Sequence, residues 1–168
     1  MKKAYIVVAI FLFVLVASSI LIHPYGHVKA AKAQKPFLQG AQIESPVFNI
    51  LQNSCRNCHS DETVWPWYSY VAPVEWLVER DVRDARGYFN MSHWDEYTPQ
   101  QRTQILAEVS SMIRNQKMPL RRYLFMHPGA KLSAEDVKLI DQWGHKERKR
   151  VKSESDHRQE IPVEMSPM

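Results

Sequence analysis

Nineteen consecutive residues near the N-terminus, Ala4 to Ile22, include no charged side chain. At a rise of 1.5 Å per residue, a helix over this segment is about 28 Å long, roughly the hydrocarbon thickness of a bilayer. No other feature constrains the fold as strongly, because such a helix either crosses a membrane or is removed as a signal peptide. Either outcome exports the remainder of the chain.

The length of the segment favours an uncleaved anchor at residues 4–22. Signal peptides have apolar cores of only about 7 to 15 residues, and the small-x-small sequence at 31–33 lies well past this one. Lys2 and Lys3 favour a cytoplasmic location for residues 1–3, although three lysines between residues 29 and 35 weaken that bias. We therefore expect a single-pass protein of the cytoplasmic (inner) membrane, with its folded part on the periplasmic, extracytoplasmic side.

The chain beyond the anchor divides into three parts by composition. Residues 23–43 contain few large apolar residues and no sustained period, so we interpret them as a linker. Residues 44–146 carry the helical patterns and are expected to form one domain, which fits a length of 168 residues. Residues 147–168 are charged and poor in apolar residues, which predicts a disordered tail. The net charge of +4 is mild, and without a Gly-rich phosphate loop we expect no binding of nucleic acid.

Helical patterns recur through the domain and no stretch alternates like a strand, so an all-α fold is expected. A T-x-x-Q capping box with Pro99 at the first position starts the best-marked helix. Another helix, over 73–88, is expected to bury Trp76 to Val78 and to leave Glu79 and Arg86 outside. The remaining helices are predicted to begin at Ser45-Pro46 and at Ser133, and to end at Cys55 and Gly144.

Both cysteines of the chain, Cys55 and Cys58, stand in the sequence C-x-x-C-H, which His59 completes. Structural zinc needs four ligands, usually from two separated pairs, and the sequence has no second pair. A redox dithiol is expected at the start of a helix beside a βαβ pattern, whereas this motif follows a helix in an all-α chain. A plain disulfide would close a very small loop and leave His59 without a role.

Covalent attachment of haem is the alternative that uses all three residues. Two intervening residues place the thiols about one helical turn apart, so that each can add to one haem vinyl group as a thioether. The adjacent His59 then lies beneath the iron as the proximal ligand. We therefore expect one covalently bound haem c within a small cytochrome c-like helical domain.

A haem iron held by His59 needs a second axial ligand or keeps an open site. Met118 is the predicted distal ligand, because it lies in a loop before Pro119 and off any apolar stripe. A core-filling role suits Met112 better, since that residue lies on the stripe of its helix. Weaker candidates for the distal ligand are His127, Met126, His93 and His145.

Several aromatic and basic residues are candidates for the haem pocket. Trp65 and Trp67 follow the C-x-x-C-H motif closely, so we expect them to wall the haem, with packing in the protein core as the alternative. The hydroxyl of Tyr123 can hydrogen-bond a haem propionate. Arg121 and Arg122 can pair with propionates, or they are solvated at the surface.

Six short patterns lie between residues 51 and 143: C-x-x-C-H-S, T-x-W-P-W-Y-S, W-L-V-x-x-D-V, N-x-S-x-W, M-P-x-x-x-Y and an L-S-x-E helix ending in Trp. With them the chain resembles the haem-binding domain proteins related to monohaem c-type cytochromes. The resemblance implies one c-type haem attached at Cys55 and Cys58, with His59 as proximal ligand, and Met118 matches the family's M-P loop. The sequence departs from the pattern at 115–117, where similar proteins often place a Gly before the M-P.

Together these features predict a membrane-anchored monohaem cytochrome that transfers single electrons and is not an enzyme. Its partners are expected to be redox proteins and, through the N-terminal helix, the membrane. Two alternatives are a peroxidase-like haem enzyme with a labile distal ligand and a haem-based redox or gas sensor. A catalytic carboxylate pair is not expected at Glu79 and Asp81, because nothing near them indicates acid–base chemistry.

Overall fold

The computed structural model describes residues 2–22, 24–26, 28–30 and 32–160. All regular structure in these residues is helical, which confirms the predicted all-α class. The chain divides into two compact units, one within residues 1–34 and 57–92 and the other within 35–56 and 93–168. The division falls inside the short helix α3 (Arg56–His59).

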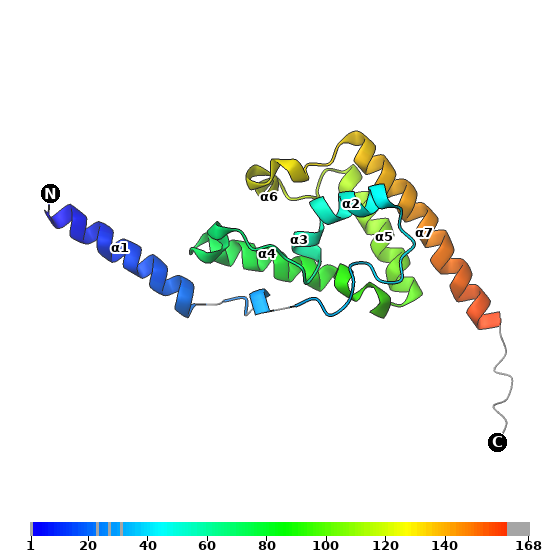
Figure 1. Ribbon diagram of the computed structural model, residues 1–168, viewed down its shortest axis with the longest axis horizontal. Helices are drawn as coiled ribbons and strands as arrows, with labels where there is room; N and C mark the ends of the chain where they lie inside the picture. Colours follow the sequence, from blue (N-terminus) through cyan, green and yellow to red (C-terminus); the bar gives the residue numbers. More distant parts are fainter. Residues whose placement is uncertain (1, 23, 27, 31, 161–168) are drawn as a thin grey trace, which may run out of the picture. The chain divides into compact units, whose positions relative to one another are not determined.

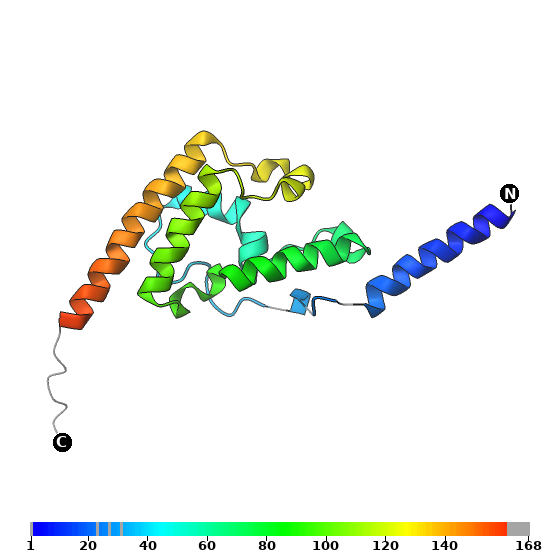
Figure 2. The same ribbon diagram turned by 180° about the vertical axis from the view of Figure 1, so that it is seen from behind.

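The first unit contains the N-terminal helix α1 (Lys2–Leu21), which is long and apolar enough to cross a membrane. None of residues 2–19 is buried within the protein. The same unit contains η1 (Val28–Ala30), η2 (Trp67–Tyr70) and α4 (Val74–Tyr88). Figures 1 and 2 both show the loop that carries η2 beside the C-terminal end of α1.

Helix α4 buries a face that differs from the predicted one. Glu79 is almost wholly buried and Arg86 is half-buried, although both were expected outside, and Leu77 is exposed although it was expected inside. The buried face carries Glu75, Glu79 and Val82. The prediction failed because it treated every charged residue as solvated, whereas each of these charges has a partner of opposite sign within its own unit.

The second unit is built on an antiparallel helix pair, α5 (Pro99–Arg114) and α7 (Ala134–Glu160), which lie side by side in both views (Figures 1 and 2). Helix α2 (Ser45–Ser54) packs on α7, and α6 (Arg121–Met126) precedes η4 (Pro128–Ala130) in the α5–α7 connection. The remaining element, η3 (Met91–Glu96), begins in the first unit, continues into the second and leads into α5. The core of the unit includes Leu51, Trp94, Leu106, Ile113, Ile140 and Trp143.

Side-chain capping bonds confirm the predicted helix starts at Thr98 and Ser133, whereas α2 begins at Ser45 after Glu44 without such a bond. Thr98 and Gln101 form a capping box, in which the Gln101 N–H donates to Thr98 Oγ1 (3.2 Å) and the Thr98 N–H donates to Gln101 Oε1 (2.8 Å). At the start of α7 the Asp136 N–H donates to Ser133 Oγ (3.1 Å). These short polar signals fix helix starts locally, which is why they could be predicted from the sequence.

The stretch expected to be a linker, residues 23–43, contributes to the core in its second half. Phe37 and Leu38 are buried, and the Phe37 ring meets the Phe48 ring of α2 edge to face at 5.5 Å. Two adjacent apolar residues make no periodic pattern, so this packing could not be predicted from the sequence. Residues 23, 27 and 31 lie outside the described residues, and so does part of the small-x-small sequence at 31–33.

The prediction of a disordered tail is wrong for residues 147–160, because α7 continues to Glu160 without a break at Gly144. A Cβ at Gly144 would lie 3.3 Å from Ser110 Oγ, so this glycine permits close approach of α7 to α5 and does not end the helix. Further along, Val151 is buried, and the Arg150 guanidinium pairs with the buried carboxylate of Glu147 and donates to Gly40 O (3.1 Å). Residues 161–168 lie outside the described residues.

Candidate functional site

The C-x-x-C-H sequence occupies the junction of two helices. Cys55 ends α2, and its N–H donates to Leu51 O (2.9 Å). After a break in the helix at Cys55, the single turn of α3 carries Cys58 and His59. Both cysteine residues are half-buried.

The imidazole of His59 is held by the residue that ends α4. Its Nδ1 lies 3.3 Å from Phe89 O, and its ring stacks on the Phe89 ring at 4.3 Å with an interplanar angle of 19°. Burial lowers the pKa of His59, and hydrogen bonding to the backbone of Phe89 and Ala85 partly opposes that effect. A neutral imidazole that donates from Nδ1 to a carbonyl presents the lone pair of Nε2, which is the form in which histidine binds a metal.

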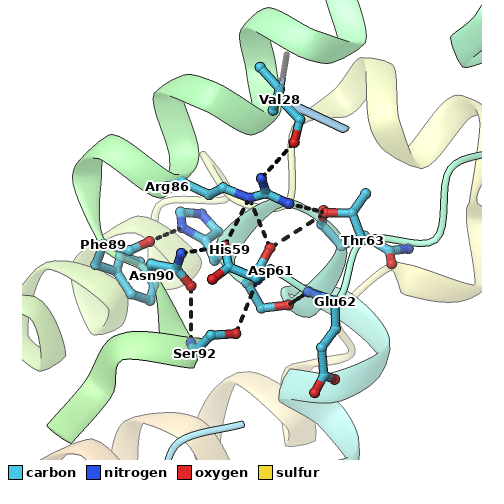
Figure 3. A network of polar contacts seen from close by, with 11 residues as sticks. Val28, His59, Asp61, Glu62, Thr63, Arg86, Phe89, Asn90 and Ser92 are labelled. Atoms are coloured by element: carbon cyan, nitrogen blue, oxygen red, sulfur yellow. Dashed lines mark hydrogen bonds and ion pairs between the residues drawn. The ribbon is translucent and has the colours of Figure 1, made fainter. Parts of the chain in front are cut away.

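Two hydrogen bonds tie the chain after His59 to the chain after Phe89, and a third braces the latter segment internally (Figure 3). The Asn90 amide donates to Asp61 Oδ1 (2.8 Å), and the Asp61 N–H donates to Ser92 Oγ (3.0 Å). The Ser92 N–H in turn donates to Asn90 Oδ1 (3.0 Å). Asn90 and Ser92 are buried, so these bonds hold the Phe89 carbonyl at a fixed place beside the imidazole.

Arg86 holds the same loop from the side of α4 (Figure 3). Its guanidinium donates to Ser60 O (2.9 Å), to Thr63 Oγ1 (2.9 Å) and to Val28 O (3.0 Å). Its Nε also lies 3.7 Å from Asp61 Oδ1. Burial lowers the pKa of Arg86, while the nearby Asp61 and Cys58 act in the opposite direction. The guanidinium therefore anchors residues 60–63 to both α4 and η1.

These groups fit a covalently attached haem. The two half-buried cysteines stand at C-x-x-C spacing, and the next residue, His59, has its Nδ1 against the Phe89 carbonyl oxygen. Histidine ligands of metals characteristically donate their second ring N–H to a carbonyl or carboxylate, as His59 does to Phe89. The donor set is thus one that can hold haem iron on one side.

The residues predicted to lie on the distal side of the haem, across from His59, belong to the second unit. Met118 is half-buried in the loop between α5 and α6. On α6, the half-buried Tyr123 stacks on His127, with ring centroids 4.4 Å apart, while Arg121 and Arg122 are exposed. His59 lies in the first unit, so its pairing with Met118 stays a prediction from the sequence.

The structure does not bring Trp67 to His59. His59 contacts Phe89 at the C-terminal end of α4, whereas Trp67 lies in η2 beside the N-terminal end of that helix. A helix of fifteen residues separates the two ends by about 21 Å. Trp65 is half-buried, with its ring 5.6 Å from Lys29 Nζ.

The weaker candidates for the distal ligand have contacts of their own. His93 Nδ1 lies 3.0 Å from Glu96 Oε2, and His145 Nε2 lies 3.8 Å from Asp141 Oδ2. Met126 is exposed at the end of α6. None of these contacts tests the ligand assignment, which stays a prediction for each residue.

The residues that position His59 were missed by reasoning from the sequence. Arg86 was expected at the surface, and no role was expected for Asp61, Asn90 or Ser92. A signal was present, since Asn90 and Ser92 are the two polar members of the N-x-S-x-W pattern. Their contact with Asp61 depends on folding, because about 30 residues separate them in the sequence.

Comparison with known proteins gives a match at the level of a protein family. A family model described as a haem-binding domain matches residues 13–146, well over half of the 168-residue chain. The match includes the C-x-x-C-H sequence and the whole network around His59. Searches of curated proteins and of solved structures found no significant match.

Proposed function

Because this chain belongs to the haem-binding domain family, we propose that it carries one covalent haem c and transfers single electrons at a membrane surface. The observation that carries the proposal is the contact between His59 Nδ1 and Phe89 O. A carbonyl oxygen at Nδ1 requires the proton on that nitrogen, which leaves the lone pair on Nε2, and histidine binds metals in this form.

Cys55 and Cys58 act as the attachment points. In each thioether the sulfur–hydrogen bond adds across a vinyl double bond, so that a carbon–sulfur bond forms and the hydrogen goes to the second vinyl carbon. No oxidant or reductant is consumed. When bound, the haem supplies one-electron chemistry by cycling between ferric and ferrous iron.

His59 serves as proximal ligand, and the Phe89 carbonyl holds its ring in orientation. Met118 is proposed as the distal ligand, because a thioether in a loop is a soft ligand that favours ferrous iron. With both positions filled, the protein excludes exogenous ligands, which favours electron transfer over peroxide chemistry. Tyr123 and the arginines of α6 are proposed partners of the propionates.

Helix α1 is proposed as the membrane anchor, with the rest of the chain after it on the extracytoplasmic side. Its length and its unburied apolar surface support this role. Lys2 and Lys3 support a cytoplasmic N-terminus. An exported location also fits thiols that must meet the haem-attachment machinery.

The first experiment tests covalent attachment. The full chain is co-expressed with haem-maturation machinery, purified in detergent and weighed by mass spectrometry after denaturation. We expect the mass of one haem to remain with the chain, and to be lost when both cysteines are replaced by Ala. A denatured chain without the added mass would refute covalent attachment.

The second experiment tests the ligand pair and hence the type of function. A low-spin ferric spectrum with the near-infrared band of Met-ligated haem is expected, and Met118→Ala is expected to abolish the band. Met112→Ala and Met126→Ala are the controls and are expected to retain it. Survival of the band in Met118→Ala would reject this ligand, and a high-spin spectrum in the unaltered protein would favour an enzyme or a sensor.

A further inference from the structure

The start of α4 exposes apolar side chains that the haem site does not use. Trp67 is 77% exposed, and the other exposed members of this surface are Tyr70, Val71, Val74 and Leu77. We call these five residues the Trp67 patch. They come from η2, from the loop after it and from the first turn of α4, all within the first unit.

The Trp67 patch adjoins the end of α1. The Ala72 N–H donates to Ser19 Oγ (2.7 Å), and the Trp76 indole N–H donates to Ile22 O (3.0 Å). Ser19 and Ile22 are among the last residues of the uncharged segment. Both views show the η2 loop at this end of α1 (Figures 1 and 2). If α1 crosses a bilayer, the patch lies at the level where the chain leaves it.

The surface around the Trp67 patch presents no charge from its own segment. Residues 65–79 contain two charged side chains, Glu75 and Glu79, and these are only 3% and 1% exposed. Both carboxylates turn inward to Lys29, whose Nζ lies 2.7 Å from Glu75 Oε1 and 3.4 Å from Glu79 Oε1. Lys29 Nζ also lies 4.3 Å from the centroid of the Tyr70 ring, beneath the patch. Burial of these charges leaves an outer face of aromatic and aliphatic groups.

Such a face matches the interfacial zone of a lipid bilayer. Trp and Tyr are enriched at this level, because their rings are apolar and their polar edges remain hydrated. Transfer of the aliphatic side chains beside them from water to the boundary of the acyl chains is favourable. We propose that the Trp67 patch inserts into the outer bilayer interface and holds the first unit against the membrane. The proposal rests on α1 being the anchor, and it assigns Trp67 to lipid in place of the expected haem wall.

The test uses the full haem-loaded chain in phosphatidylcholine vesicles that contain a photoreactive phosphatidylcholine. The reactive diazirine sits near the top of the acyl chain. After irradiation and proteolysis, mass spectrometry maps the lipid adducts to residues. We expect adducts in α1 and in the Trp67 patch. Tyr88, 69% exposed at the far end of α4, is the internal control and is expected to carry none.

Two variants sharpen the test. Trp67→Ser with Leu77→Ser is expected to lose the patch adducts while the α1 adducts stay unchanged, and Tyr88→Ser is expected to change neither. Adducts in α1 alone would overturn the proposal that the Trp67 patch inserts into the bilayer and leave the anchor intact. A second copy of the chain that covers the patch would have the same consequence. The absence of adducts from α1 would overturn the anchor and the patch together.

Discussion

The Nδ1 atom of His59 and the carbonyl oxygen of Phe89 lie 3.3 Å apart, although 30 residues separate them in the chain. This contact joins the C-x-x-C-H turn to the end of α4. It fixes which ring nitrogen is offered to a metal, and it makes the position of α4 part of the ligand site. In the proposed haem site, residues that fix the Phe89 carbonyl would therefore act on the iron through His59.

Asn90→Ala is expected to lower the free energy of unfolding by about 1–3 kcal/mol, because it leaves buried partners unsatisfied. A looser Phe89 carbonyl also accepts a weaker hydrogen bond from Nδ1, which makes the imidazole a poorer donor to ferric iron. The reduction potential is therefore expected to rise. Denaturant titration and potentiometry measure the two effects. Asn49→Ala on the exposed face of α2 is the control, and an unchanged potential in Asn90→Ala would contradict the positioning role.

Arg86→Met is expected to destabilise the protein by about 2–4 kcal/mol, because it removes three hydrogen bonds and the ion pair with Asp61. Arg86→Lys is expected to recover only part of the loss, since one ammonium cannot reach partners on both sides. Urea denaturation of the full chain in detergent gives both values. Arg83→Met, which loses only exposed contacts with its neighbour Asp84, is expected to change stability by less than about 1 kcal/mol. Equal losses of stability for Arg86→Met and Arg83→Met would show that the buried contacts of Arg86 contribute no more than exposed ones.

Lys29→Met is expected to cost about 3–5 kcal/mol, because two buried carboxylates lose their counter-charge. Their second oxygens already lack a hydrogen-bond partner, so no other group compensates. Adding Glu75→Gln and Glu79→Gln to Lys29→Met is expected to restore part of the stability. Thermal denaturation of the single and triple variants shows whether the unpaired carboxylates cause the loss of stability. A triple variant less stable than Lys29→Met would mean that charge is not the cause.

Arg150→Ala is expected to destabilise the second unit by about 3 kcal/mol, since it leaves the buried Glu147 carboxylate without its cation. Exposed Lys149→Ala, one residue away, is expected to change stability by less than about 0.5 kcal/mol. Hydrogen exchange gives a second measurement, with faster exchange expected in the last turns of α7 for Arg150→Ala alone. Matching behaviour of the two variants would show that this end of α7 is held by other contacts.

Two glycines within helices are expected to respond in opposite directions. Gly144→Val places bulk against Ser110 and the Leu106 carbonyl, so the α5–α7 pair must separate and the melting temperature falls. Gly87→Ala adds a methyl group where no atom lies within 4 Å, and it is expected to stabilise α4 by about 0.5–1 kcal/mol. Differential scanning calorimetry compares the two. A stabilised Gly144→Val would show that α7 does not depend on close approach at this point.

The amino-acid sequence determined the features that depend on local order along the chain. The uncharged segment at residues 4–22, the capping box at Thr98 and the C-x-x-C-H spacing each act over at most a few turns of helix. They were sufficient to predict the all-α class, the main helix starts and the residues expected to hold a haem. The distal ligand Met118 remains a prediction from such a local pattern.

Only the tertiary structure decided how distant residues act on these local features. It placed the Phe89 carbonyl on His59, turned Glu75 and Glu79 inward to Lys29, and used Gly144 for close packing where a helix end was predicted. The physical reason is the same in each case. Whether a charge is solvated or paired, and whether a glycine ends a helix or admits a neighbour, depends on which group folding brings beside it.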